Sequence, residues 1–394
     1  MGVQQETRTP LRYWLAVFSV TVGTFVIVTS QLLPVGLVPQ IAVALGVSEG
    51  TVGLTLTVPG FVAAFAAPAL TVAASRFDRR LILTGLSALL VAANLVSAIA
   101  TDFTVLLIAR ILVGLSVGGF WAIAGGIAVR LVPEAVVGRA TATIFAGVST
   151  ATVAGVPAGK LLGDLAGWRT AFAVLGVAAL GVLIVQAFLL PALPAARTTK
   201  LGDLLSLFRH PEIRLSFVAV FLLVIGHFSA YTFITPILRE SGGTPPALIT
   251  ALLLAYGGAG FAGNFLGGTA AYRRPRRTLI VAAAGLGGSL LLFPIVGQTL
   301  PGLIALLLVW GTAYGAVPVS LQIWLGSAVP DRREIAGALF VTAFQVSISL
   351  GALFGGLWVD SLGTTGVLLF GGALTVLTSA GLLLARPSPA TTLD

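Results

Sequence analysis

The stretch Gly155–Gly167 reads GVPAGKLLGDLAG, and the stretch Gly351–Gly363 reads GALFGGLWVDSLG. Both place a second Gly four residues after the first, an Asp five residues later and a closing Gly three residues after that, at an offset of 196 positions. Each stretch lies within or beside a long apolar run. A repeat of this kind indicates a chain built from two similar halves. The pairs Arg79-Arg80 and Arg276-Arg277 repeat at an offset of 197.

The composition places these halves in a lipid bilayer. Charged residues make up 9% of the chain and apolar residues 57%, whereas soluble domains carry roughly a quarter charged residues. A spanning helix needs about 20 apolar residues, so the 394 residues hold about a dozen spans. The apolar segments fall near 13–38, 50–74, 80–100, 104–131, 138–163, 168–190, 214–238, 245–271, 277–297, 301–328, 334–358 and 364–385.

These segments divide naturally into six plus six. The longest polar interruption runs from Pro191 to Pro211. We therefore predict an all-α membrane protein with twelve transmembrane helices in two pseudo-symmetric six-helix bundles: an N-terminal bundle (1–190), a cytoplasmic linker (191–213) and a C-terminal bundle (214–394). Six spans per half keep both halves in the same orientation, so an axis along the membrane normal relates them.

The distribution of basic residues predicts the topology. Most of the 22 Lys and Arg fall in alternate connections, on the side that would also hold the N-terminus. Because cytoplasmic loops of membrane proteins are enriched in Lys and Arg, both termini are expected in the cytoplasm. The apolar run from Tyr13 to Val38 is too long for a secretory signal and predicts the first span. The basic residues lie between apolar runs rather than on one polar face, which argues against nucleic-acid binding.

Several classes of function are disfavoured. The chain has no cysteine and only two histidines, His210 and His227, and neither a metal-ligand cluster nor a Ser-His-Asp or Cys-His arrangement is apparent. The nucleotide-binding pattern Gly-x4-Gly-Lys-Ser/Thr is absent from the sequence. We therefore expect no enzyme activity, cofactor, metal or nucleotide-driven pump, and we expect a monomer in the bilayer.

Three motifs resemble those of the major facilitator superfamily, in its drug and metabolite proton-antiporter branch. Asp78-Arg79-Arg80, after the second predicted span, looks like a shortened form of the family's loop motif. Arg110-x3-Gly114-x3-Gly118 looks like its span 4 motif, and Gly155-x-Pro157-x-Gly159 like its span 5 antiporter motif. The pieces Gly119-Phe120-Trp121-Ala122 and Val317-Pro318-Val319 look most like bacterial purine-ribonucleoside and sugar efflux permeases.

The resemblance implies roles for these motifs. It assigns Asp78, Arg79 and Arg80 to a gate that pins spans 2 and 11 together in the outward-open state, although this loop lacks the family's leading Gly. The alternative is a basic anchor on the cytoplasmic side. Arg110 is expected to hold helices together through carbonyl groups or a nearby acid such as Asp102, rather than to contact substrate. The small residues Gly114, Gly118, Gly155 and Gly159 allow close helix packing, and Pro157 adds a bend.

The same resemblance implies that spans 1, 4, 7 and 10 line a central cavity. Residues that share a face of each span are the candidates for substrate contact, with burial against a neighbouring helix as the alternative for each. They are Thr24 and Gln31 in span 1, Trp121 in span 4, His227 and Tyr231 in span 7, and Tyr314 and Gln322, beside Trp310 and Pro318, in span 10.

No acidic residue falls in the middle of a predicted span. Because histidine titrates near neutral pH, His227 is the candidate for the coupled proton. The alternative is a neutral His227 that hydrogen-bonds across a helix interface, in which case a loop carboxylate such as Asp78 is the next candidate. Where relatives often carry an acid in span 1, this chain has Gln31.

A cavity without a central acid has little to hold a desolvated cation. The sequence therefore predicts export of a small neutral metabolite or drug, nucleoside-like or sugar-like, across the bacterial cytoplasmic membrane by proton antiport with alternating access. Multidrug efflux of amphiphilic compounds and a proton-independent uniporter of the same fold are the alternatives.

Overall fold

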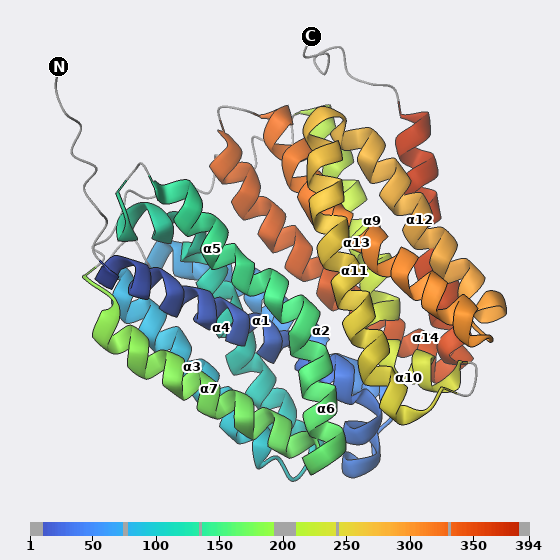
Figure 1. Cartoon of the computed structure of the whole chain (residues 1–394), viewed down its shortest axis with the longest axis horizontal. Helices are drawn as coiled ribbons and strands as arrows, with labels where there is room; N and C mark the ends of the chain where they lie inside the picture. The colour runs from blue at the N-terminus through green and yellow to red at the C-terminus, as the bar shows by residue number, and fades with distance from the viewer. Residues whose placement is uncertain are drawn as a thin grey trace.

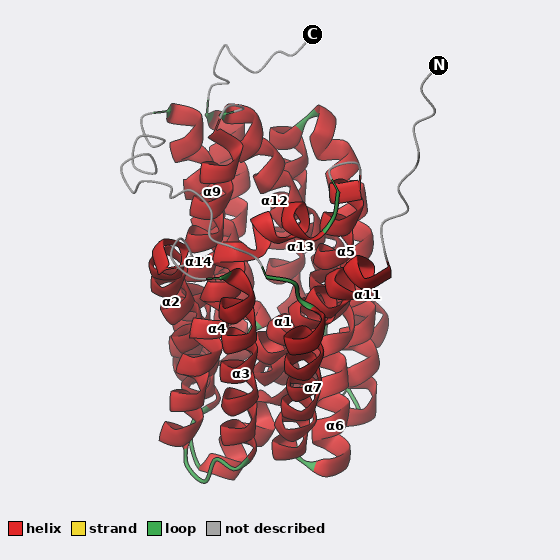
Figure 2. Ribbon diagram, turned by 90° about the vertical axis from the view of Figure 1, so that its left-hand side faces the viewer, coloured by secondary structure: helices red, strands yellow, loops and turns green. Residues whose placement is uncertain are grey.

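The structure is a computed structural model that describes residues 11–73, 78–133, 136–192, 210–241, 244–329 and 332–385. Within these ranges all regular structure is helical (Figure 2). Most of the predicted linker, residues 193–209, lies outside them. The elements are α1 (Leu11–Leu45), α2 (Glu49–Ala73), α3 (Arg79–Ala98), α4 (Phe103–Leu131), α5 (Val137–Thr150), the π turn η2 (Ala151–Gly155), α6 (Val156–Ala166), α7 (Trp168–Leu189), α9 (Pro211–Tyr231), α10 (Ile234–Glu240), α11 (Pro246–Arg273), α12 (Pro275–Val296), α13 (Leu300–Ala328) and α14 (Arg333–Leu384).

In the described ranges, eleven helical segments are long and apolar enough to cross a membrane, and the last of them contains two crossings. Phe370 stacks on Trp358 with ring centroids 5.5 Å apart and lies 6.1 Å from Phe354. Along a straight helix these residues would be about 18 and 24 Å apart, so α14 folds back on itself. The turn is at Gly363 (φ 69°, ψ −170°). Dividing α14 there gives the twelve spans that the sequence predicts.

Gly363 closes the second of the two repeated sequence stretches, and Gly167 closes the first. Gly167 also has a positive φ, 86° with ψ 153°, and it separates α6 from α7. Residues with a Cβ rarely adopt these dihedral angles, so glycine is required at both positions. The repeat therefore marks the same kind of turn in each half of the chain.

Two predicted spans are interrupted, each at a proline. The predicted span 138–163 contains η2, which ends two residues before Pro157. The predicted span 214–238 breaks after Tyr231, and a short helix, α10, restarts two residues before Pro236. A proline has no N–H for the carbonyl four residues earlier, so it disrupts the α-helical ladder in the preceding turn. A bend at Pro157 is predicted from the sequence, whereas the break in span 7 is not.

The helices gather in two groups in the order of the chain, α1–α7 on one side and α9–α14 on the other (Figure 1). Contacts between the groups join α2 to α14, α11 to η2 and α6, and α1 to α10. Within the first group, Gly155 and Gly159 lie against Thr29 and Leu33 of α1. Small residues therefore let these backbones approach closely.

A matching contact occurs in the second group, where Gly351 and Gly355 of α14 lie against Phe228, Ser229 and Phe233. Spans 5 and 11 thus pack on spans 1 and 7 through glycines of the repeated stretch. Likewise, Gly114 and Gly118 of α4 lie against α2, and Gly263 and Gly267 of α11 lie against α13.

Successive spans run in opposite directions, so the connections lie at two ends. One end, here called the arginine-rich end, carries the basic residues Arg79, Arg80, Arg130, Arg139, Arg273, Arg274, Arg276, Arg277, Arg332 and Arg333. At this end Arg80 donates to the carbonyl of Ala187, at 2.5 Å, and Arg276 donates to the carbonyls of Leu382 and Ala385. Each arginine thus holds the last helix of its group. These contacts make Arg80 the counterpart of Arg276, at an offset of 196 rather than the 197 of the sequence match.

Candidate functional site

Four aromatic side chains of spans 7 and 10 form one cluster, made of the buried His227 and Tyr231 of α9 with the buried Trp310 and the half-buried Tyr314 of α13. The His227 ring stacks on Tyr314 with centroids 3.3 Å apart and on Tyr231 with centroids 5.1 Å apart. Trp310 lies edge-on to it at 6.1 Å. Tyr256 of α11 extends the stack, 5.3 Å from Tyr231. Three helices of the second group are therefore joined by ring contacts around His227.

The hydrogen bond from Trp310 defines the tautomer of His227. The indole Nε1 of Trp310 donates to Nδ1 of His227 at 3.1 Å. Because an indole N–H only donates, Nδ1 carries no proton and the neutral ring is protonated at Nε2. Nε2 is buried and has no hydrogen-bond partner among the described residues. His227 thus presents one unsatisfied N–H inside the protein.

A second buried polar cluster lies between the two groups of helices. Nε2 of Gln31, in α1, donates to Oε1 of Gln345, in α14, at 3.5 Å. The Nε2 of Gln345 is buried and has no partner among the described residues. An amide group left unsatisfied in this way can bind a polar ligand or water. Gln345 was not predicted, because the cavity residues were sought only in spans 1, 4, 7 and 10.

The other three predicted cavity residues make different contacts. The hydroxyl of Thr24 donates to the carbonyl of Val20 within α1, at 2.8 Å. Trp121 of α4 is half-buried and lies 6.0 Å from Phe145 of α5, ring to ring. Gln322 is exposed near the arginine-rich end of α13. None of these contacts reaches the His227 or Gln31 clusters.

Arg110 is fully buried inside the first group. Its guanidinium donates to the carbonyl of Ser30 at 3.0 Å and to the hydroxyl of Ser97 at 2.7 Å, and it lies 4.9 Å from the Phe172 ring centre. Asp102, the acid considered as its partner, caps α4 by accepting from the N–H of Val105. Arg110 therefore links α4 to α1, α3 and α7, and no described carboxylate lies within ion-pair distance of it.

The loop motif begins α3. Asp78 is the N-cap of this helix and accepts a 2.8 Å hydrogen bond from the backbone N–H of Arg80, which satisfies a donor that the helix itself cannot. Arg80 donates to α7, as described above. Arg79 is the first residue of α3.

The end opposite the arginine-rich end carries contacts between the groups that the sequence analysis missed. The carboxylate of Asp360 accepts from the hydroxyl of Ser48 at 2.7 Å and from the N–H of Gly50 at 3.0 Å. Arg239 pairs with Glu49 at 2.8 Å. Asp360 occupies the same position of the repeated stretch as Asp164, which marks it as a candidate. A single sequence does not show which helix it faces.

Two further contacts join the groups nearer their middle. The hydroxyl of Thr235 donates to the carbonyl of Val35 at 2.9 Å, and that of Thr57 donates to the carbonyl of Ser349 at 3.3 Å. The two groups are thus hydrogen-bonded from this end as far as the Gln31–Gln345 pair.

A family model of the Major Facilitator Superfamily matches residues 20–352 and, in a second match, residues 243–393. The chain belongs to the major facilitator superfamily. It is therefore a multi-pass membrane transporter and not an enzyme. Among the described residues, no group of three His, Cys, Asp or Glu side chains could hold a metal ion.

Curated relatives narrow the comparison within this superfamily. The chain is 34% identical over 369 residues to a purine ribonucleoside efflux pump, NepI, of Salmonella paratyphi A, covering 93% of this chain and 92% of the relative. It is 33% identical over 368 residues to the protein of the same name in Escherichia coli O127:H6, with the same coverage.

Solved structures agree on the fold. The D-xylose-proton symporter superposes with a TM-score of 0.77 at 17% identity, covering 96% of this chain and 99% of that one. The nucleoside transporter NupG, solved as a point mutant, superposes with a TM-score of 0.76 at 14% identity, covering 95% of this chain and 99% of that one.

Proposed function

We propose that this transporter exports a small neutral metabolite, with purine ribonucleosides as the first candidates, by proton antiport with alternating access. The observation that carries the proposal is the 34% identity to purine ribonucleoside efflux pumps over 93% of the chain. Multidrug efflux of amphiphilic compounds is the alternative on the same fold. The transporter acts as a monomer in the bacterial cytoplasmic membrane.

The moving parts are the two groups of helices, residues 1–190 and 214–394, with residues 191–213 as their linker. Contacts inside each group are made by the repeated glycine stripes. Between the groups, α2 packs closely on α14, where Gly50 lies against Gly356, and hydrogen bonds of Asp360 and Glu49 join the groups at one end. Hydrogen bonds between small polar groups can be broken and re-formed at low cost, so they suit an interface that opens.

The arginine-rich end faces the cytoplasm in this proposal, because short cytoplasmic loops are enriched in Lys and Arg. The contacts of Asp360 and Glu49 then close the extracellular end, and the structure corresponds to a state closed to the outside. Asp78 and Arg79 act as the gate at the other end, and Arg80 and Arg110 hold the spans of the first group together.

The substrate contacts follow from the two polar clusters. A purine ribonucleoside has a flat ring with hydrogen-bonding edges and a polyhydroxyl sugar. The rings of His227, Tyr231 and Tyr314 supply stacking surfaces, and Gln31 with Gln345 supplies amide groups that donate and accept. Thr24, Trp121 and Gln322 are assigned to the walls of the same cavity.

Proton coupling through His227 requires a rearrangement at Trp310. In the structure, the indole N–H faces an unprotonated Nδ1 at 3.1 Å. If Nδ1 were protonated, its N–H would face the indole N–H of Trp310, and two donors cannot hydrogen-bond to each other. The charged ring would then have to turn, or α9 and α13 would have to separate. A proton on His227 would thus shift the packing of spans 7 and 10.

A uniporter of the same fold is the second candidate. It is favoured by the placement of the acids, because Glu49, Asp102, Asp164, Glu240 and Asp360 all lie at helix ends. Without a carboxylate or a titrating histidine in the cavity, transport would follow the substrate gradient alone.

Counterflow in proteoliposomes separates these candidates. Inosine, a purine ribonucleoside, is supplied with and without a pH gradient, and wild type is compared with His227→Gln. The antiport proposal expects uphill accumulation with wild type and only downhill exchange with His227→Gln. Equal accumulation by both proteins would remove His227 as the carrier, and the absence of uphill accumulation by wild type would establish the uniporter.

The substrate class is tested on the purified protein by thermal shift. We expect purine ribonucleosides to raise the melting temperature, and Gln31→Leu to reduce that rise. If no nucleoside shifts the melting temperature while an amphiphilic drug does, multidrug efflux replaces nucleoside export.

A further inference from the structure

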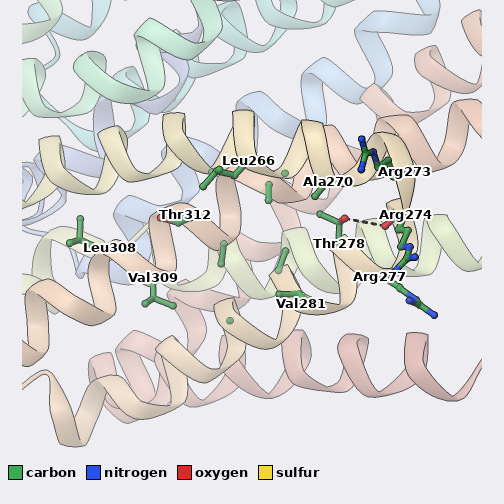
Figure 3. A pocket seen from close by; sticks show the side chains of 16 residues that line it. Leu266, Ala270, Arg273, Arg274, Arg277, Thr278, Val281, Leu308, Val309 and Thr312 are labelled. Atoms are coloured by element: carbon green, nitrogen blue, oxygen red, sulfur yellow. Dashed lines mark hydrogen bonds between the residues drawn. The ribbon is translucent and has the colours of Figure 1, made fainter.

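The second group of helices has an open groove on its outer surface, and none of the candidate site residues described above lines it. It has a volume of about 960 Å³ and lies between α11 and α12, with α13 as its floor (Figure 3). Thr312, Ala313 and Ala316 form the floor, while Leu266 and Val281, 63% and 72% exposed, form the walls. The lining is otherwise apolar over most of its length.

Three arginines stand at one mouth of this groove. Arg273 and Arg274 end α11, and Arg277 lies in the first turn of α12. All three are exposed, and no described carboxylate lies within ion-pair distance of them. Figure 3 shows their side chains gathered at this mouth, with the apolar side chains along the rest of the groove. The groove is therefore strongly basic at one end and apolar beyond it.

We propose that this groove binds an anionic phospholipid of the leaflet at the arginine-rich end. The phosphate contacts Arg273, Arg274 and Arg277, and an acyl chain lies along Leu266, Val281 and the floor. Arginine suits this role because its planar guanidinium donates several hydrogen bonds to phosphate. The apolar groove surrounds the chain with more protein surface than a flat helix face offers.

The length of the groove agrees with a lipid of one leaflet. On α11 the lining runs from Arg273 to Gly263, which is about 15 Å along the helix axis. The hydrocarbon of one leaflet is about half of a 30 Å bilayer core. With the phosphate held at the arginines, the acyl chain of the lipid would thus lie along the whole length of the groove.

Small residues keep the groove open. Gly285 of α12 faces the floor, where an added Cβ would meet only the Cβ of Ala313, at 3.5 Å. That is an ordinary van der Waals distance, so a side chain at this position fills the groove without displacing a helix. Gly285→Leu is therefore a variant that blocks the acyl chain and leaves the arginines unchanged.

The test is native mass spectrometry of the full chain with phosphatidylglycerol and with phosphatidylethanolamine as the probes. The charge variant is Arg273→Gln/Arg274→Gln/Arg277→Gln. Its control, Arg12→Gln/Arg139→Gln/Arg214→Gln, removes three other exposed arginines from the same end. At about 1 kcal/mol per basic residue, the charge variant should bind phosphatidylglycerol about 100-fold more weakly.

We expect wild type and the control triple variant to prefer phosphatidylglycerol, and Gly285→Leu to lose most of that binding. Two results would overturn the proposal. One is an equal loss in the control, which would show attraction to the whole basic end. The other is unchanged phosphatidylglycerol binding by either groove variant.

Discussion

The carboxylate of Asp360 accepts a 2.7 Å hydrogen bond from the hydroxyl of Ser48, a residue in the other group of helices. It also caps the start of α2 by accepting from the N–H of Gly50. Its counterpart in the repeat, Asp164, accepts instead from Gln40 and pairs with Lys160, both in its own group. The same acid thus joins the two groups in one half of the chain and stabilises a single group in the other.

Asp360→Asn should favour the state that is open at this end. The substitution removes the charge and weakens both hydrogen bonds; because Asp360 is solvent-exposed, we expect a loss of about 1 kcal/mol and a shift of about fivefold in the open population. The chain has no cysteine, so alkylation of a cysteine introduced at the buried Thr57 reports opening directly.

Asp164→Asn is the matched control for this measurement, because its contacts stay within one group. Its alkylation rate should equal that of the parent. If Asp360→Asn reacts no faster than Asp164→Asn, the Asp360 contact does not close this end.

The Glu49–Arg239 pair should contribute less, because it is a single ion pair whereas Asp360 accepts two hydrogen bonds. The Arg239 side chain is 46% exposed and that of Glu49 is 22% exposed, and solvent-exposed ion pairs contribute about 0.2–1 kcal/mol. Arg239→Gln should therefore change the alkylation rate at Thr57 less than Asp360→Asn does. A larger effect of Arg239→Gln would reverse the ranking of the two contacts.

Arg110→Met should lower the melting temperature without changing which substrates bind. It removes two charge-assisted hydrogen bonds, to Ser30 and Ser97, and leaves a buried carbonyl without a donor, which we expect to cost on the order of 3 kcal/mol. Arg214→Met, at an exposed position of α9, is the control and should melt like wild type. Loss of nucleoside binding at an unchanged melting temperature would instead place Arg110 in the substrate site.

Gly159→Leu should impair transport because it separates spans 1 and 5. An added Cβ at Gly159 would meet the Leu33 side chain of α1, whereas one at Gly181 of α7 would meet nothing within 4 Å. Gly181→Leu is therefore the matched control for an added side chain. We expect nucleoside counterflow to fall only for Gly159→Leu; normal counterflow by that variant would show that the close packing is dispensable.

The sequence alone supported the membrane class and the twelve spans, because apolar runs and turn residues are local signals. The glycine repeat indicated two similar halves and close helix packing at Gly155 and Gly159, but it did not show that the partners are spans 1 and 7 or that Gly167 and Gly363 form the turns. The break before Pro236 was missed because the apolar run continues through it.

The site was less predictable, because its contacts join residues far apart in the chain. Helical spacing placed His227 and Tyr231 on one face, but it did not reveal that Trp310 donates to His227. Gln345 and Asp360 were missed for the same reason. Their hydrogen-bond partners, Gln31 and Ser48, lie more than 300 positions away in the chain. Spacing within one helix carries no information about the facing helix.

The proposed transport cycle requires the two groups of helices to open alternately at the two ends. Spin labels at exposed positions measure this directly, with Val43→Cys and Leu362→Cys at one end and Leu81→Cys and Leu384→Cys at the arginine-rich end. When inosine and a pH gradient are applied, we expect one distance to lengthen as the other shortens. Two distances that change together, or that both stay fixed in a protein shown to transport, would rule out alternating opening.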